Sequence, residues 1–489
     1  MSQHFDSIVI GAGYAGAAAA ALLANNAKDT LLIEAHYALG GCASFFRRKH
    51  FFFDSGATTL SGVLPNQPLG QLQKQLGISF QLSHLPIGMI IKSKQGDIIR
   101  YADKNQWIQE CNTHFPHPQQ ADFWSELYRL EKKVWDIVAN NPFFPPATAT
   151  DIFRLAKPSN LKGITLLKGI ISPLDALLKH YRLHDNPQFR RFIDEQLIIS
   201  TQSYADTAPY ITSAMGLTYP SQTYYPYGGI VQPVKAIINS FTDNGGTLRT
   251  NEAVTAIHKQ KNSWLIHTSK GKTFSAKNLI SSIPVWNMPS ITHDDVRQYF
   301  HKKAKHFDFS WGAFMVYFAI ETKESLPTAY YQIHTEEIIP HCQSRSFFAT
   351  ISLSDDTIKA PAGWKTVTIS THTLTRHWME MNDHDYHHAK HQTLEYIMQH
   401  FDKHFPQLRH CKKEWINAAT PRTFSHYTHR LNGNVGGIPH SIKQNFLTLP
   451  HNVTPFKGLY HIGDSAFPGQ GTPSVVLGAS NVVQRILQE

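Results

Sequence analysis

Residues 7–34 read SIVIGAGYAGAAAAALLANNAKDTLLIE, and this stretch decides the fold. The β-branched run 7–10 predicts a short buried strand, and the alanine-rich run that ends at Ala24 predicts a helix. Residues 25–29 break the helix, and residues 30–34 predict a second strand. The stretch therefore predicts a strand–helix–strand unit whose first turn has the spacing G-x-G-x-x-G.

The three glycines of this turn have separate physical tasks. Gly11 permits the tight turn, Gly13 lets the backbone approach a pyrophosphate, and Gly16 lets the helix pack close to the strand. The helix N-terminus offers unpaired N–H groups and the positive end of its dipole to the phosphates. Glu34 lies 23 residues after Gly11, where a carboxylate can hold a ribose hydroxyl. We therefore predict a dinucleotide site here.

The composition is that of a large globular protein. The chain of 489 residues is 42% hydrophobic and 17% charged, which excludes wholesale disorder. Its formal net charge is +10, but the Lys and Arg residues are scattered, so we predict no nucleic-acid partner. The four cysteines lie far apart in the sequence and indicate no disulfide scaffold, which favours a reducing, cytoplasmic compartment.

The uncharged run 7–24 allows a second interpretation. On hydropathy alone it could be a signal peptide or a membrane helix. Residues 1–6 carry no Lys or Arg, so the positive region that begins a signal peptide is missing, and the run contains the spaced glycines. We therefore favour the dinucleotide interpretation, and we expect no other segment to span a bilayer.

A second glycine pair follows the first unit. Gly40-Gly41 comes shortly after Glu34, and Phe53-Asp54 and Gly56 come next. These residues resemble the N-terminal signature of the flavin amine oxidase and phytoene desaturase superfamily. In flavoproteins with this layout, the glycine pair lets the chain pass over the pyrophosphate and the flavin. The resemblance implies FAD as the cofactor, and we find no second G-x-G-x-x-G unit for a separate NAD(P)H domain.

A second segment of the chain extends the resemblance. Residues 225–229 (YPYGG) precede a predicted helix, and residues 245–257 (GGTLRTNEAVTAI) lead into a predicted strand. This order is similar to the second cofactor segment of the superfamily. There the main chain of a valine contacts the adenine, a role that the resemblance carries over to Val254. Gly245-Gly246 alone would indicate only a helix end and a turn.

The third segment lies near the C-terminus. Residues 458–473 read GLYHIGDSAFPGQGTP and precede a predicted helix at 474–487. Asp464 follows a short predicted strand, where its carboxylate could accept hydrogen bonds from the ribityl chain. Thr472 suits an N-cap and Pro473 suits the first helical turn. The resemblance implies that the positive end of this helix faces the pyrimidine edge of the flavin.

Residues 467–471 (FPGQG) indicate which branch of the superfamily the chain resembles. With residues 420–427 (TPRTFSHY), they look most like the carotenoid isomerase branch and related carotenoid desaturases. Amine oxidases typically have Gly-Glu in place of Gly463-Asp464 and lack the FPGQG run. The resemblance therefore favours an enzyme of the carotenoid branch.

From the three segments we expect an α/β fold: a Rossmann-like FAD-binding domain of the glutathione-reductase/amine-oxidase type, with a discontinuous mixed α+β substrate domain. We assign residues 1–105, 215–289 and 411–489 to the FAD-binding domain, and residues 106–214 and 290–410 to the substrate domain. The expected cofactor-binding residues are Gly11, Ala12, Gly13, Ala15, Gly16, Glu34, Ala35, Gly40, Gly41, Cys42, Ala43, Val254, Gly463, Asp464, Thr472, Pro473 and Val475.

The predicted substrate domain contains features that suit an apolar ligand. Residues 121–138, 164–180 and 188–200 predict helices, and residues 308–320 (DFSWGAFMVYFAI) alternate as a strand. One face of this strand carries Phe309, Trp311, Ala313, Met315 and Tyr317. Such a face could form the floor of a tunnel for a conjugated chain, but a plain sheet core explains the pattern equally well.

Residues 162–182 mix apolar side chains with Lys162, Lys168, Lys179 and Arg182. A basic amphipathic helix can lie on an anionic membrane, and a long polyene is found in lipid, so peripheral attachment to the inner face of a membrane is one interpretation. The other is an ordinary amphipathic helix that packs on the core.

Residues 383–391 contain four histidines, two pairs of which have i, i+4 spacing. This spacing can bind a metal, but these histidines mostly lie opposite the apolar face of a predicted helix. We therefore favour a solvated face and expect no metal site.

The function that these patterns favour is an FAD-dependent oxidoreductase acting on carbon–carbon double bonds of a long apolar polyene or isoprenoid, as a carotenoid-like desaturase, isomerase or saturase. Reduced flavin would pass its electrons to a quinone, to oxygen or to a soluble carrier. The sequence identifies no catalytic side chain. The alternatives are a flavin-dependent amine oxidase and a non-catalytic prenyl-binding escort protein, which would usually lack the intact glycines.

Overall fold

The computed structural model describes the whole chain except residues 1–2, 158–159, 161–162, 308–310 and 489. The first of its two large sheets has the order β10-β11-β12-β1-β2-β9, and β18 pairs with β12. Its strands are β1 (Gln3–Ile10), β2 (Thr30–Ile33), β9 (Thr247–Arg249), β10 (Val254–Lys259), β11 (Trp264–Thr268), β12 (Thr273–Ser281) and β18 (Leu459–His461). Strand β1 lies in the centre, parallel to both β2 and β12.

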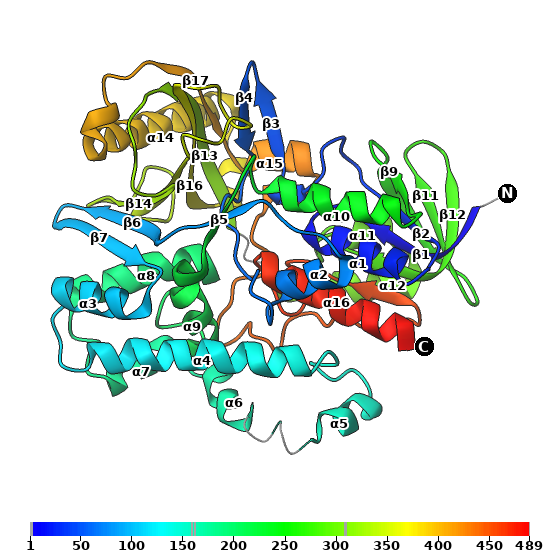
Figure 1. The fold of residues 1–489 in the computed structure, drawn as a ribbon. Helices are drawn as coiled ribbons and strands as arrows, with labels where there is room; N and C mark the ends of the chain where they lie inside the picture. The colour runs from blue at the N-terminus through cyan, green and yellow to red at the C-terminus, as the bar shows by residue number, and fades with distance from the viewer. Residues whose placement is uncertain (1–2, 158–159, 161–162, 308–310, 489) are drawn as a thin grey trace.

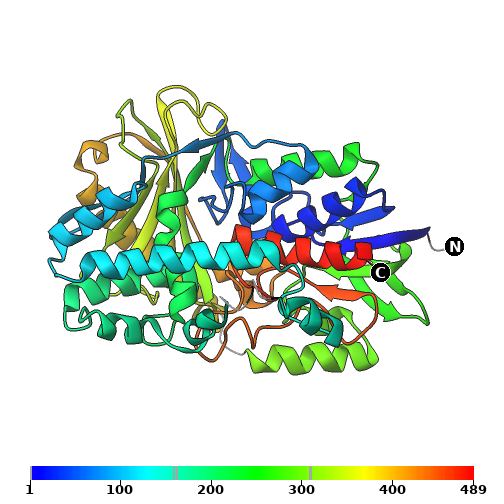
Figure 2. The same ribbon diagram turned by 60° about the horizontal axis from the view of Figure 1, so that its bottom comes forward.

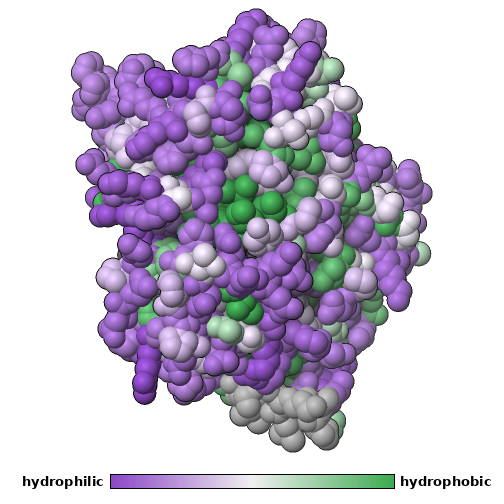
Figure 3. Space-filling model, turned by 60° about the vertical axis from the view of Figure 1, so that its left-hand side comes forward, coloured by the Kyte–Doolittle hydropathy of each residue, from purple (hydrophilic) through white to green (hydrophobic). Residues whose placement is uncertain are grey.

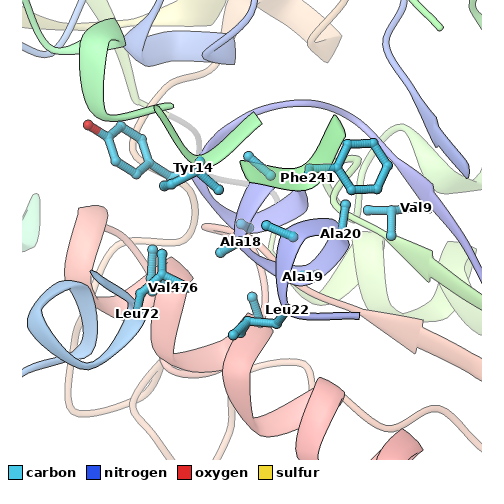
Figure 4. Packing of buried hydrophobic residues seen from close by; sticks show 14 of the residues in the cluster. Val9, Tyr14, Ala18, Ala19, Ala20, Leu22, Leu72, Phe241 and Val476 are labelled. Carbon is cyan, nitrogen blue, oxygen red and sulfur yellow. The ribbon is translucent and has the colours of Figure 1, made fainter. Parts of the chain in front are cut away.

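Helix α1 (Tyr14–Asn25) follows β1, as the alanine-rich run predicts. It is buried along almost its whole length, because helices pack on it from several sides. Those helices are α2 (Pro68–Leu76), α10 (Val231–Asp243) and α16 (Thr472–Gln488), and Figure 4 shows Leu72, Phe241 and Val476 around the alanines of α1. The small alanine side chains let these neighbours approach closely, so the predicted strand–helix–strand unit forms the core of this half of the molecule.

The other face of the first sheet is covered by α11 (Met288–Ile291) and α12 (Asp294–His306). Met288, Val296 and Phe300 pack there with Trp264 and Phe274 of the strands. The sheet is therefore sandwiched between two helical layers (Figure 1). This three-layer arrangement confirms the expected α/β, Rossmann-like fold.

The second large sheet has the order β17-β13-β16-β15-β14-β6-β7. Its strands are β6 (Ile87–Ser93), β7 (Gly96–Tyr101), β13 (Trp311–Glu321), β14 (Tyr330–His334), β15 (Ser346–Ile351), β16 (Trp364–Leu374) and β17 (Lys413–Ala419). Helix α14 (Asp383–His404) covers one face through Ile397 and Phe401. Helix α13 (Thr375–Met379) follows β16.

The strand pairing of this sheet bears on the expected domain boundaries. Strands β6 and β7 lie within residues 1–105, and β17 lies within residues 411–489, yet all three pair in the second sheet. The division of the chain into domains stays a prediction. We propose to assign these three strands to the substrate domain, because β17 pairs with β13 and β6 pairs with β14, and β7 in turn pairs with β6.

The remaining strands form two small two-stranded sheets. One pairs β3 (Phe45–Arg48) with β4 (Phe51–Asp54), and the other pairs β5 (Leu82–His84) with β8 (Tyr224–Pro226). Short 3-10 turns occupy Gly41–Ala43, Tyr219–Gln222, Pro406–Leu408 and Leu431–Gly433. Helix α15 (Pro421–Thr428) follows β17 and lies beside the Leu431–Gly433 turn.

A group of helices occupies the lower part of Figure 1, most of them below the second sheet and α5 (Ala149–Leu155) below α16. Besides α5, they are α3 (Lys104–His114), α4 (Gln120–Asn140), α6 (Ile164–Ile171), α7 (Leu174–His180), α8 (Pro187–Thr201) and α9 (Tyr210–Thr218). Figure 2 shows the long helix α4 running from this group towards α16. Beyond the end of α4, Asp151 forms an ion pair with Arg485 of α16 at 2.9 Å and so joins the two halves.

The expected single helix at 164–180 is wrong, because it is broken into α6 and α7 at Ser172-Pro173. Ser172 has extended backbone angles (φ −106°, ψ 137°), as the residue before a proline prefers. Pro173 also lacks the N–H that would continue the helix. The basic amphipathic helix expected over 162–182 is therefore two shorter helices, and Lys162 lies outside the described residues.

Among the described residues, no helix combines the length and apolar character needed to cross a bilayer. The face seen in Figure 3 is mostly hydrophilic, and its hydrophobic residues gather near the centre.

Candidate functional site

A cavity of about 820 Å³, here called the dinucleotide cavity, lies at the carboxyl ends of β1 and β2. Most of the expected cofactor-binding residues line it. They are Gly11, Gly13, Ala15, Glu34, Ala35, Gly40, Gly41, Cys42, Ala43, Val254, Gly463, Asp464, Thr472 and Val475. Three segments that lie far apart in the sequence therefore meet around one space.

The N-terminus of α1 opens onto this cavity without a side-chain cap. Gly13 is the N-cap residue, and no side chain bonds to the first N–H groups of the helix. A Cβ atom added to Gly13 would meet only the Gly40 backbone oxygen, at 3.8 Å. Free N–H groups beside open space suit a phosphate group. The residues present therefore fit the pyrophosphate of a dinucleotide.

The Glu34 carboxylate forms hydrogen bonds with the backbone beside the glycine turn. It accepts them from the backbone N–H groups of Ala12 at 2.7 Å and of His36 at 2.9 Å. Ala12 is not among the residues that line the cavity, and its backbone N–H donates to Glu34, so its role in cofactor binding stays a prediction. Glu34 itself does line the cavity, so a ligand can reach the acid expected to hold a ribose hydroxyl.

Two further expected residues lie outside the dinucleotide cavity. Gly16 packs against the first turn, where an added Cβ atom would lie 1.8 Å from the Gly11 oxygen. Its task is close helix packing, as the sequence predicts. Pro473 lines a neighbouring cavity and touches Gly62, where an added Cβ atom would lie 2.4 Å from the Pro473 Cβ atom.

Asp464 has a partner that the sequence analysis missed. Its Oδ2 atom accepts from Nη2 of Arg430 at 2.8 Å, and both side chains are largely buried. Arg430 also donates to the backbone oxygen of Asn434 at 2.6 Å and to its side-chain oxygen at 3.0 Å. A lone buried carboxylate needs a counter-charge. That requirement is the signal that could have pointed to a cation near Asp464.

Cys42 lies beside this ion pair at the base of the cavity. Burial raises the pKa of its thiol, and the guanidinium of Arg430, which forms a hydrogen bond with the thiol, opposes that rise. Desolvation is the larger cause, so the thiol is held in its neutral form. Cys42 therefore acts here as a small, uncharged wall residue.

A second cavity of about 650 Å³, here called the apolar cavity, adjoins the first. Seven residues line both cavities: Cys42, Ala57, Phe424, Gly436, Gln470, Gly471 and Thr472. Helices α4, α6 and α9 supply much of its wall, with side chains such as Val134, Leu166, Ile170, Ile211 and Met215. The N-terminus of α16 at Thr472 faces the place where the two cavities meet.

Strand β13 supplies the floor of this region. Ala313 and Met315 line the apolar cavity, and Tyr317 on the same face lines the dinucleotide cavity. Phe314, Val316 and Phe318 on the opposite face pack under α14. One face of the strand therefore forms the cavity floor and the other is plain core. Phe309 lies outside the described residues.

The charge of the apolar cavity is low. No lysine or arginine is among the described residues that line it. Its two histidines are His440, which is buried, and His372, which is half-buried, and desolvation lowers the pKa of each to about 4. Both are neutral near pH 7. Among the described residues we also find no group of three or more metal-ligating side chains.

Comparison with known proteins agrees with this geometry. The family model described as "Flavin containing amine oxidoreductase" matches residues 14–487. A prolycopene isomerase from an Oncidium hybrid is 25% identical over 99% of this chain and 84% of its own. A carotenoid 3,4-desaturase from Haloarcula japonica is 20% identical over 99% of this chain and 98% of its own. The all-trans-retinol 13,14-reductase of Danio rerio is 22% identical over 98% and 86%.

Two solved structures share the fold. An oxidoreductase from Methanosarcina mazei has a TM-score of 0.65 at 18% identity and covers 98% of this chain and 99% of its own. Putrescine oxidase bound to putrescine has a TM-score of 0.63 at 13% identity, with full coverage of both chains. The family match spans nearly the whole chain, and the glycine-lined cavity fits the cofactor of that family. The chain belongs to the flavin-containing amine oxidoreductases, and it is an FAD-dependent oxidoreductase.

Proposed function

We propose that this protein changes carbon–carbon double bonds in a long apolar polyene or isoprenoid, as a carotenoid-like desaturase, isomerase or saturase. The observation that carries the proposal is the apolar cavity, which meets the dinucleotide cavity along seven shared residues. An uncharged chain could therefore lie against a flavin along a wall whose described lining contains no lysine or arginine. Relatives named for prolycopene, carotenoid and retinol chemistry support the same substrate class.

FAD, when bound, supplies the exchange of hydride or electrons with the substrate. We propose that the free N–H groups of α1 hold its pyrophosphate and that Glu34 holds its ribose. The backbone of Val254 would face the adenine, and Asp464, held by Arg430, the ribityl chain. The positive end of α16 at Thr472 would stabilise negative charge on the ring. The apolar walls exclude water from the reacting bond.

The amine oxidase alternative is less well supported. Such an enzyme usually brings a lysine close to the flavin on the substrate side. The described lining of the apolar cavity contains none, and Lys390 lines the dinucleotide cavity alone. The escort-protein alternative is also weaker, because the glycines that line the dinucleotide cavity are intact. We propose a quinone or oxygen as the electron acceptor for any net desaturation.

Replacing Ala313 tests the use of the apolar cavity. Ala313→Phe places a ring on the cavity floor without touching the glycine turn. We expect normal FAD content but at least about 10-fold weaker retention of a hydrocarbon polyene such as lycopene, measured by gel filtration and extraction. Unchanged retention in this variant, with wild-type protein retaining the polyene, would contradict the proposal.

We also propose that helices α5 and α6 attach the protein peripherally to the inner face of the cytoplasmic membrane. Ile152, Phe153, Leu167 and Ile171 are large exposed apolar side chains, 61%, 83%, 48% and 61% exposed. Leu166, Leu167 and Ile170 of the same region line the apolar cavity. Burying these apolar groups in a lipid surface is favourable, and it would bring the cavity to the lipid in which a polyene dissolves.

A vesicle experiment tests this attachment. Phe153→Asp combined with Ile171→Asp should abolish co-sedimentation with vesicles of phosphatidylglycerol and phosphatidylethanolamine. Ile416→Asp is the matched control, because Ile416 is 45% exposed on β17, at the opposite side of the molecule (Figure 1). Equal sedimentation of all three proteins would rule out docking through α5 and α6.

A further inference from the structure

Glu131 is an unusual side chain for the wall of an apolar cavity. Helix α4 places it there, one turn before Trp135, which also lines the cavity. The residue is only 8% exposed. Apart from the two neutral histidines, Glu131 is the only acidic or basic residue in the described lining of this cavity.

The hydrogen bonds of Glu131 come from uncharged groups. The indole N–H of Trp135 donates to its carboxylate. The Gln222 side-chain amide donates to Oε1 at 3.3 Å. Gln222 is itself held by Gln67, whose amide donates to the Gln222 oxygen at 2.5 Å. The Gln67 oxygen accepts from the backbone N–H of Leu64 at 3.2 Å, so the backbone orients the whole chain of amides.

Glu131 forms no ion pair with any described residue. Burial raises the pKa of its carboxyl group, which is the effect expected of a desolvated acid. The charge of Lys132 acts to lower the pKa of Glu131, but the Lys132 ammonium itself pairs with Asp136 at 2.9 Å. A buried acid without a cation destabilises a fold unless its oxygens receive hydrogen bonds. Trp135 and Gln222 both donate, so they use about two of the roughly four acceptor sites of the carboxylate, and the others remain for a donor in the cavity.

We propose that Glu131, supported by Gln67 and Gln222, recognises a hydroxyl group at one end of an otherwise apolar substrate. This inference rests on the proposed function and narrows its substrate class to polyenes or isoprenoids that carry an O–H group. The remaining wall is apolar enough for the hydrocarbon part. Glu131 accepts the O–H hydrogen, which anchors the substrate and sets which double bond lies beside the flavin.

A hydroxyl group fits this wall better than an ammonium group does. An ammonium has three N–H donors, whereas a hydroxyl has one. The oxygens of Gln67 and Gln222 already accept hydrogen bonds, from Leu64 and from Gln67. The Glu131 carboxylate is therefore the main acceptor left in this group. A hydroxyl can donate its single O–H to it and leaves no N–H of its own without an acceptor.

The test compares three ligands of nearly equal shape: all-trans-retinol, its O-methyl ether and retinylamine. Dissociation constants are measured by equilibrium dialysis in the dark, on the FAD-loaded protein. We expect wild-type protein to bind the alcohol about 10-fold more tightly than the ether, because only the alcohol can donate to Glu131. Glu131→Leu should remove this preference while keeping its affinity for the ether.

Glu126→Gln is the matched control. Glu126 lies on the same helix but pairs with Arg129 at the surface, so this variant should keep the wild-type preference. Equal binding of the alcohol and the ether to wild-type protein would overturn the inference and leave the proposed function standing. Tighter binding of the amine than of the alcohol would also overturn it. Failure of all three ligands to bind would overturn the inference and the proposed function together.

Discussion

At the scale of single residues, a larger side chain at Gly13 should impair FAD binding without impairing folding. The Gly13 φ of −73° is open to any residue, and an added Cβ atom would have only the Gly40 oxygen near it, at 3.8 Å. We expect Gly13→Val to fold normally but to bind FAD at least about 100-fold more weakly, because the side chain occupies the space of the pyrophosphate. Flavin absorbance per mole of protein, beside the circular dichroism spectrum, measures both properties.

Gly16 provides the contrast. An added Cβ atom there would lie 1.8 Å from the Gly11 oxygen, so Gly16→Val should destabilise the fold by about 3 kcal/mol or more. A Gly13→Val protein that keeps its flavin would refute the assignment of the α1 N-terminus to the pyrophosphate.

At the scale of elements, the Arg430–Asp464 pair joins the loop after α15 to the end of β18. We expect Arg430→Met to lower the free energy of unfolding by about 3 kcal/mol, because it leaves the Asp464 carboxylate buried and unpaired. The double variant Arg430→Met/Asp464→Leu should recover part of that loss, since neither charge then remains. Urea titration measures wild-type protein, both single variants and the double variant, and additive losses in the double variant would show that the pair is not coupled.

Helices and strands could be predicted where neighbouring residues determine them, and not where contacts between distant segments do. The unit at residues 7–34 was predictable because its strand, glycine turn and helix are contiguous, and each is favoured by its own residues. The break at Ser172-Pro173 could also have been predicted from Pro173. The apolar pattern continues on both sides of Pro173, however, and it favoured a single helix. The pairing of β6, β7 and β17 with β13–β16 was not predictable, because it depends on contacts between distant segments.

The same limit applies to the site. Residues in glycine motifs, such as Gly40 and Asp464, could be proposed because those motifs resemble the cofactor segments of a known superfamily, and both residues line the cavity. Arg430 and Glu131 have no motif of their own, and their roles depend on what surrounds them in space. The face of β13 that forms the cavity floor was visible as an alternation, but only the fold decides which face meets the cavity.

At the scale of the whole molecule, buried histidines make stability depend on pH. Burial lowers the pKa of His372, His440 and His461 to about 4, and that of His334 to about 3. Their ordinary pKa is about 6.5, so the unfolded chain binds protons that the folded protein does not. Stability from these groups is complete above about pH 6.5 and is lost as the pH falls towards about 4.

The expected loss is about 1.4 kcal/mol per pH unit for each histidine within that window. His372→Phe should reduce the slope by that amount, whereas the variant His388→Asn, at an exposed position on α14, should leave it unchanged. Denaturant unfolding between pH 7 and pH 5 measures the slope. An identical slope for wild-type protein and His372→Phe would contradict this account.

The molecule holds two cavities that meet, and we assign one to FAD and the other to an apolar chain. The most direct test is the visible absorption spectrum of protein purified from a carotenoid-producing host and from a non-producing host. We predict flavin bands in both preparations and an additional polyene signature in the first alone. Flavin bands without any polyene would contradict the assignment of the apolar cavity. A spectrum without flavin in either preparation, even after FAD is added, would contradict the central claim itself.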